Sequence, residues 1–134
     1  MKTNNLLPIF LFATIILVSC EKEYISTKDN SAPLDLSKPI SFSATVSPIF
    51  TANCLGSGCH ISGGPPPNLM ADKSYDQLTM LGYVDADTPD TVPENSSLYK
   101  RLIAIAKPMP PSGKLPQNKI EAIALWIKQG SQNN

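Results

Sequence analysis

The amino-acid sequence predicts an all-α fold in which short helices are joined by long loops. Apolar residues recur at helical spacing in several segments, and no segment alternates apolar and polar residues as a half-buried strand would. The 13 prolines and 7 glycines gather largely between the apolar segments, where they interrupt regular structure. A folded domain of about 90 residues with so few core positions usually needs a stabilising element in addition to its apolar core.

The first two predicted helices cover residues 43–53 and 74–81. Residues 43–53 place apolar side chains at positions i, i+3 and i+4, namely Val46, Ile49 and Phe50. Pro48 fits this helix only in the first turn, where its missing N–H is not needed. Ser74 is predicted to be the N-cap of the second helix.

The last two predicted helices cover residues 96–106 and 117–128. Asn95 or Ser96 is expected to cap the first of them, which ends before Pro108 and has an apolar stripe of Leu98, Leu102 and Ile105. Residues 117–128 have the clearest helical pattern, with an apolar face formed by Ile120, Ile123, Ala124 and Ile127. Gly130 suits the position after the end of this helix. Residues 107–116 contain four prolines and are predicted to be extended.

The first 20 residues are typical of an export signal. Lys2 precedes an apolar run at residues 6–18 that is short for a membrane span, and a small residue follows the run. The sequence Leu17-Val18-Ser19-Cys20 resembles a bacterial lipobox, in which the chain is cut before the cysteine and the cysteine carries lipid. We therefore expect a signal peptide at residues 1–19, a lipidated Cys20 with a flexible tether at 20–40, and a folded domain at 41–134. An ordinary signal peptide or an uncleaved anchor is the alternative.

The charge of the mature chain argues against nucleic-acid binding. Removal of residues 1–19 takes away one of the 11 Lys and Arg residues and none of the 11 Asp and Glu residues, which leaves a net charge of −1. Phosphate binding needs a basic surplus that this chain lacks. Acidic residues gather at 85–94 and basic residues at 100–128, and this asymmetry either steers a partner or marks an ordinary solvated surface.

The three cysteines give the sharpest chemical signal. If lipid occupies Cys20, Cys54 and Cys59 remain, and they must form a disulfide, bind a metal or attach a group covalently. His60 directly follows Cys59, which is the arrangement of a covalent haem site. There two thiols add to the vinyl groups of the haem, and the histidine becomes an axial ligand of the iron. The spacer here has four residues instead of two, and Gly56 and Gly58 give it freedom to bulge.

Three other interpretations of Cys54, Cys59 and His60 compete with haem. A zinc site would need a fourth ligand from Asp or Glu, because the chain has a single histidine. A disulfide between Cys54 and Cys59 suits an oxidising compartment and would leave His60 as an ordinary loop residue. A Cys-His nucleophile lacks a third residue to orient the imidazole.

A methionine is the expected second axial ligand, since no second histidine exists. Met70, Met80 and Met109 remain after cleavage of the signal peptide. Met109 lies between Pro108 and Pro110 on a stiff, non-helical segment, which suits a side chain held against haem. Met70 and Met80 are better explained as apolar gap-fillers.

From about Ser43 to Gly130 the chain resembles small bacterial class I cytochromes c, especially the cytochrome domains of exported lipoproteins. The matching pieces are residues 46–50, Cys59-His60, residues 95–99, Met109-Pro110-Pro111 and residues 120–130. The resemblance implies three to five short helices and long loops around one haem. It also implies that the N- and C-terminal helices cross, with Ile49 and Phe50 against Ile123, Trp126 and Ile127.

These observations predict an electron carrier and not an enzyme. One haem c would be bound covalently through Cys54 and Cys59, with His60 and Met109 as axial ligands of its iron. The expected partners are redox proteins and, through the lipid on Cys20, a membrane, with no nucleic acid and no small-molecule substrate. The chain is expected to be exported and anchored to the cell membrane or outer membrane, with its domain in the periplasm or at the cell surface. A haem-based sensor and a haem-free interaction domain with a Cys54–Cys59 disulfide are the alternatives.

Overall fold

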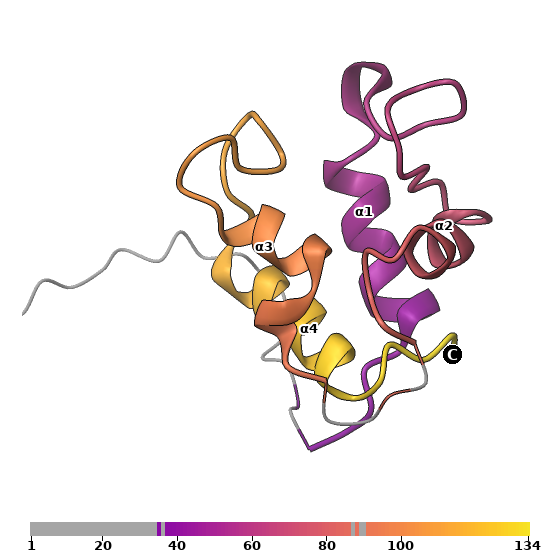
Figure 1. Cartoon of the computed structure of the whole chain (residues 1–134), viewed down its shortest axis with the longest axis vertical. Coiled ribbons are helices and arrows are strands. Elements are labelled where there is room, and N and C mark those ends of the chain that lie inside the picture. The colour runs from indigo at the N-terminus through magenta and orange to yellow at the C-terminus, as the bar shows by residue number, and fades with distance from the viewer. Residues whose placement is uncertain (1–34, 36, 87, 89–90) are drawn as a thin grey trace, which may run out of the picture.

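The computed structural model describes residues 35, 37–86, 88 and 91–134, and these residues form helices and no strand. The predicted all-α class is therefore confirmed for the described part of the chain. Its elements are the π-helix η1 (Phe42–Val46), α1 (Ser47–Asn53), the 3-10 helix η2 (Gly56–Gly58), α2 (Ser74–Met80), the 3-10 helix η3 (Pro93–Asn95), α3 (Ser97–Ile103) and α4 (Gln117–Lys128). Figure 1 shows α1 and α2 on one side of the molecule and α3 on the other, with α4 below and between them.

The predicted helix at 43–53 corresponds to η1 followed without a break by α1. The Ser41 hydroxyl caps the start by accepting a hydrogen bond from the Ala44 N–H at 3.1 Å. Pro48 lies in the first turn of α1, as predicted. The wider π-helical turn comes just before this proline, whose ring and missing N–H disfavour a regular α-helical turn there.

The second helix matches the prediction in position, but Ser74 is not its N-cap. Lys73 holds that position, and Ser74 is fully buried with a hydroxyl that has no hydrogen-bond partner. The chain is already turning before Ser74, because the N–H groups of Lys73 and Ser74 both donate to the Met70 carbonyl. Ser74 therefore enters the helix from a turn, and its side chain faces the interior instead of the open end.

The third helix begins as predicted and ends earlier than predicted. Ser96 is the N-cap, and its hydroxyl accepts a hydrogen bond from the Tyr99 N–H at 3.2 Å. The helix stops at Ile103, and Ile105, predicted to belong to its apolar stripe, is 94% exposed. The Arg101 carbonyl accepts a hydrogen bond from the Met109 N–H at 3.0 Å, so it is not used by Ile105 to continue the helix.

The last helix has the predicted bounds. Ile120, Ile123 and Ile127 are buried and Ala124 is half-buried, while Ala122 and Trp126 extend the buried face. Gly130 takes a φ of +92° just after the helix, and the N–H of Ser131 returns to the Trp126 carbonyl.

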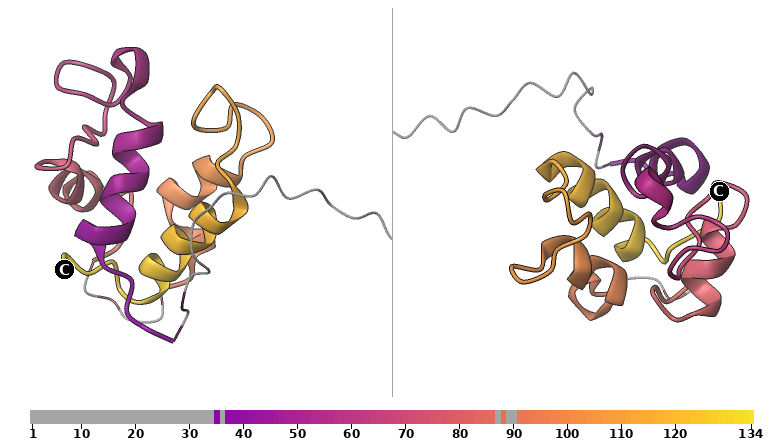
Figure 2. Two further views of the ribbon diagram at one scale, coloured as in Figure 1. Left: turned by 180° about the vertical axis from the view of Figure 1, so that it is seen from behind. Right: turned by 90° about the horizontal axis from the view of Figure 1, so that it is seen from above.

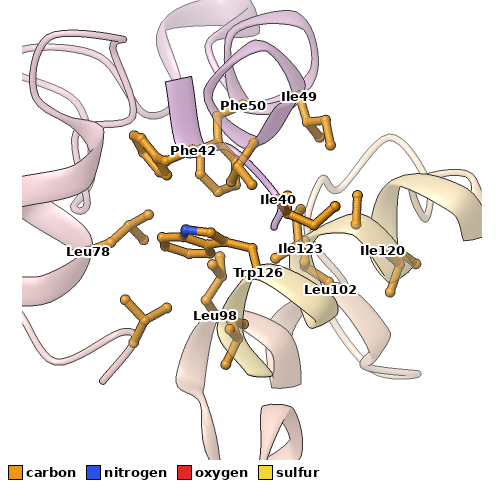
Figure 3. Packing of buried hydrophobic residues seen from close by; sticks show 14 of the residues in the cluster. Ile40, Phe42, Ile49, Phe50, Leu78, Leu98, Leu102, Ile120, Ile123 and Trp126 are labelled. Carbon is orange, nitrogen blue, oxygen red and sulfur yellow. The ribbon is translucent and has the colours of Figure 1, made fainter. Parts of the chain in front are cut away.

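The core gathers around Trp126, which is completely buried (Figure 3). The ring of Phe42 in η1 lies 5.1 Å from that of Trp126 in α4, measured between centroids, and 6.4 Å from that of Phe50. The predicted contact residues Ile49, Phe50, Ile123, Trp126 and Ile127 all belong to this one apolar cluster. The first and last helical segments therefore pack together and form the scaffold for the loops.

The predicted signal peptide at 1–19, Cys20 and most of the tether at 20–40 lie outside the described residues. Within the described ranges, no helix has the length and apolar character required to cross a membrane. Ile40 is the first buried residue along the described chain, and its N–H donates to the Gln129 side chain at 2.7 Å.

Candidate functional site

Cys54, Cys59 and His60 lie on a compact turn at the end of α1. Cys54 closes the helix, with its N–H donating to the Phe50 carbonyl at 2.8 Å. The His60 N–H then donates back to the Cys54 carbonyl at 3.1 Å, so the four-residue spacer closes upon itself. Ser57 and Gly58 make this turn possible with left-handed φ values of +54° and +75°. The predicted bulge is thus a closed backbone turn whose two ends, Cys54 and His60, are joined by a hydrogen bond.

Both thiols of this turn are free and half-buried. Burial and, as the smaller cause, the neighbouring Cys59 together raise the pKa of the Cys54 thiol to about 11. At neutral pH Cys54 is therefore a protonated thiol and a weak nucleophile until a reaction partner is positioned against it.

The imidazole of His60 is held from one side by backbone carbonyls. Its Nδ1 lies 3.0 Å from the Pro67 oxygen and 3.2 Å from the Pro65 oxygen. A carbonyl oxygen only accepts hydrogen bonds, so Nδ1 must carry the proton and donate it. In the neutral imidazole the lone pair then resides on Nε2, which is a form in which a histidine binds a metal ion.

Met109 lies on the loop between α3 and α4. This loop is fastened to α3 by the Met109 N–H on the Arg101 carbonyl, and by the Lys114 ammonium, which donates to the Ile103 carbonyl at 3.2 Å. The loop is non-helical, as predicted, but it is not extended throughout, because the Gly113 N–H donates to the Pro110 carbonyl at 3.1 Å and closes a turn. Met109 is half-buried. The front and rear views show the loop between α3 and α4 extending from the same end of the molecule as the turn that follows α1 (Figures 1 and 2).

The other two methionines are poorly placed as gap-fillers, contrary to the prediction for them. Met80 is 80% exposed and Met70 is 38% exposed. Met80 ends α2 on its solvent side, and Met70 lies in the turn that leads into that helix. Neither belongs to the buried core, so the half-buried Met109 differs from both in its environment.

The side chains present fit a covalently attached haem. Two free thiols, an oriented imidazole and a methionine loop occupy one end of the fold, and the exposed side chains of Ile103 and Ile105 flank the start of that loop. An apolar macrocycle could cover such exposed aliphatic side chains.

Two features of the described residues concern the zinc and disulfide interpretations. No three His, Cys, Asp or Glu side chains in this part of the chain converge in a way that could hold a metal ion by themselves. Cys54 and Cys59 are not bonded to each other.

A pocket of about 290 Å³ lies elsewhere, between η1, the start of α1 and α2. Phe42, Ser47, Asp72, Tyr75 and Asp76 are among its lining residues. None of Cys54, Cys59, His60 and Met109 lines it. The pocket is therefore separate from the candidate site.

No family model, curated protein or solved structure matches this chain. The assignment of the site therefore depends on the residues themselves.

Two features of the site were not predicted from the sequence. The carbonyls of Pro65 and Pro67 orient His60, and Gly64 allows their loop to lie directly on the Cys59 backbone. The signal for the first was the run of three prolines at 65–67, because prolines stiffen a loop and cannot donate backbone hydrogen bonds of their own. The close approach at Gly64 has no local signal in the sequence.

Proposed function

We propose that this protein is an exported, lipid-anchored monohaem cytochrome c that transfers electrons. The observation that carries the proposal is the orientation of His60: two backbone carbonyls accept hydrogen bonds from its Nδ1, so the neutral imidazole keeps its lone pair on Nε2, and two unpaired thiols lie on the same short segment of the chain. Haem, when bound, supplies an iron that alternates between the ferrous and ferric states. The helical fold is compatible with the class I cytochrome c architecture that the sequence resembles.

Cys54 and Cys59 are proposed to hold the haem by two thioether bonds. In each bond the sulfur joins one vinyl carbon, and the thiol proton goes to the other carbon, so no external oxidant or reductant is consumed. The turn closed by the His60 N–H on the Cys54 carbonyl keeps both sulfurs on one short segment. The protonated state of Cys54 suits this role, since it protects the thiol from premature oxidation.

His60 and Met109 are proposed to occupy the two axial positions of the iron. His60 arrives with its ring orientation and tautomer already set by Pro65 and Pro67. Met109 comes from a loop stiffened by prolines and fastened to Arg101. A thioether ligand raises the reduction potential, and two protein ligands leave no open position for substrate, which suits an electron carrier.

Lipid on Cys20 would hold the domain at a membrane by the tether at residues 20–40. About 20 flexible residues span about 25 Å on average, enough to let the domain meet redox partners near the membrane surface. A mass measurement of the N-terminal peptide from membranes tests this, because a chain that begins at Cys20 with added acyl mass is expected. A chain that retains residues 1–19, or an unmodified Cys20, contradicts the anchor.

Cysteine variants of the exported protein test the attachment. The protein is produced with haem-maturation machinery, denatured, and examined for haem that remains on the chain. We expect C54S and C59S each to keep at most one thioether and the double variant to release all haem, whereas the control Ser62→Ala behaves like the wild type. Haem loss that is equal in the wild type and the double variant would refute covalent attachment and favour a haem-free domain or a disulfide.

A further inference from the structure

The loop at residues 61–67 lies directly against the backbone of the turn at residues 54–60, which is called the attachment turn below. A Cβ built on Gly64 would be 2.1 Å from the Cys59 carbonyl oxygen, 2.8 Å from the Gly58 oxygen and 3.2 Å from the Cys59 carbonyl carbon. All three are backbone atoms, which cannot rotate out of the way as a side chain could. Gly64 does not have a positive φ, so its requirement is for close approach and not for an unusual backbone conformation.

This contact lies immediately before the two carbonyls that hold His60. Gly64 is followed by Pro65, and Pro67 comes two residues later, while the Gly64 N–H donates to the Ile61 carbonyl at 3.0 Å. The loop therefore turns back at Gly64 and carries the Pro65 and Pro67 oxygens to Nδ1 of His60. The contact between Gly64 and the Cys59 backbone therefore sets the distance between this loop and the attachment turn.

We infer that Gly64 is a positioning residue for His60. Its missing side chain lets the loop lie on the Cys59 backbone, which places two carbonyl acceptors at Nδ1 and leaves the Nε2 lone pair for the iron. A methyl group at this position would push the loop or the turn away by about 1 Å, because ordinary carbon–oxygen contacts are longer than 3 Å. Hydrogen bonds of 3.0 and 3.2 Å do not survive a separation of that size. The inference rests on the proposed function only for the identity of the metal that Nε2 binds.

The glycines of this region supply a matched control. Gly56 lies in the same turn and has no positive φ, and a Cβ there would have no neighbour within 4 Å. The variants Gly56→Ala and Gly64→Ala thus make the same chemical change on either side of the same segment. Only the second change creates a collision.

The first test reads the tautomer of His60 in the full chain without haem. His60 is the only histidine, so the ring nitrogens of a ¹⁵N-labelled protein give unambiguous NMR signals. At pH 8.5, where an ordinary imidazole is neutral, we expect the Nδ1–H form in the wild type and in G56A. In G64A we expect at least a tenfold gain in the Nε2–H form relative to the Nδ1–H form. An unchanged tautomer in G64A would overturn the inference.

A second variant protects this test against a folding defect. Fluorescence of Trp126, buried in the core, reports whether each variant is folded. Insertion of one glycine between Gly64 and Pro65 displaces the two carbonyls without adding a side chain. We expect this insertion to increase the Nε2–H form of His60, as G64A does. If G64A does not fold, the insertion variant alone decides whether the loop sets the tautomer. A folded insertion variant with the wild-type tautomer would contradict the role of this loop register.

The haem-loaded protein provides a separate measurement. Loss of the hydrogen bonds at Nδ1 makes the imidazole a weaker electron donor, so the midpoint potential of G64A should lie above that of the wild type and G56A. Equal potentials in all three proteins would count against the inference and leave the proposed function intact. If the wild type takes up no haem, the proposed function fails, while the tautomer measurement still decides the role of Gly64.

Discussion

The raised pKa of Cys54 predicts that this thiol is unusually slow to react in the folded, haem-free protein. Its pKa moves from 9.0 to about 11, mainly through burial. At pH 8 this lowers the thiolate fraction about a hundredfold, because each pKa unit changes it about tenfold. A more basic thiolate is also more nucleophilic. With a Brønsted slope of about 0.4–0.5, its rate constant rises nearly tenfold and offsets part of the hundredfold loss of thiolate. The net expectation is alkylation of native Cys54 about tenfold slower than in the unfolded chain.

Iodoacetamide labelling followed by peptide mass spectrometry measures this rate for Cys54 alone. The rate should rise about tenfold per pH unit through pH 10 in the native protein and level off near pH 11, whereas in denaturant it should level off near pH 9. In C59S the native midpoint should fall below 11 but stay above 9, because burial is the larger cause of the shift. A native profile that levels off near pH 9 would refute the buried environment assigned to Cys54.

The same shift predicts how stability depends on pH. The folded protein holds the Cys54 proton more tightly than the unfolded chain, so this contribution is fully present below pH 9 and is lost between about pH 9 and 11. Partial exposure of the thiol limits it to on the order of 1 kcal/mol. In urea unfolding of the haem-free proteins, the stability of the wild type should fall relative to that of C54S over this range. Parallel curves would contradict the prediction.

Three further variants test the core, a helix cap and the second axial ligand. Trp126→Ala should lower the free energy of unfolding in urea by about 3–5 kcal/mol, since it empties the centre of the core, while the 94% exposed Ile105→Ala should change it by less than about 0.5 kcal/mol. Ser96→Ala should cost about 1–2 kcal/mol in the same assay, because the hydroxyl caps α3 and also donates to the Tyr83 carbonyl at 2.9 Å, and an unchanged midpoint would contradict the cap. Met109→Ala should keep covalent haem, lose the long-wavelength absorption band of methionine-ligated ferric haem and bind CO rapidly. The control Met80→Ala, at an 80% exposed position, should keep both the haem and the band and should not bind CO rapidly. The reverse result would contradict Met109 as ligand.

The sequence predicted best those features that depend on neighbouring residues. The bounds of α4 followed from its apolar periodicity, from the proline before it and from Gly130 after it, all of which act within one or two turns. The Ser96 cap was predictable for the same reason, since its partner Tyr99 is three residues away.

The errors arose at backbone contacts in the loops that border the helices, which helical periodicity does not encode. Ile105 lies outside α3 because the Met109 N–H occupies a carbonyl of the helix, and periodicity cannot anticipate that contact. Ser74 is buried because the turn at Met70 precedes it.

At the candidate site, the residue types were readable from the sequence and their orientation was not. Cys59-His60 is a local motif, and adjacency alone indicates its chemistry. The tautomer of His60 depends on carbonyls that approach from five and seven residues along the chain. Their approach depends on a backbone contact at Gly64, which only the folded chain displays.

The haem content and intact mass of the wild-type protein, exported in cells with haem-maturation machinery, test the central claim most directly. We predict one haem per chain by the pyridine haemochrome assay, and a mass increase of one haem that persists after denaturation and maps to the peptide containing Cys54, Cys59 and His60. A colourless protein, or one whose two thiols are both free for alkylation after reduction, would contradict the account.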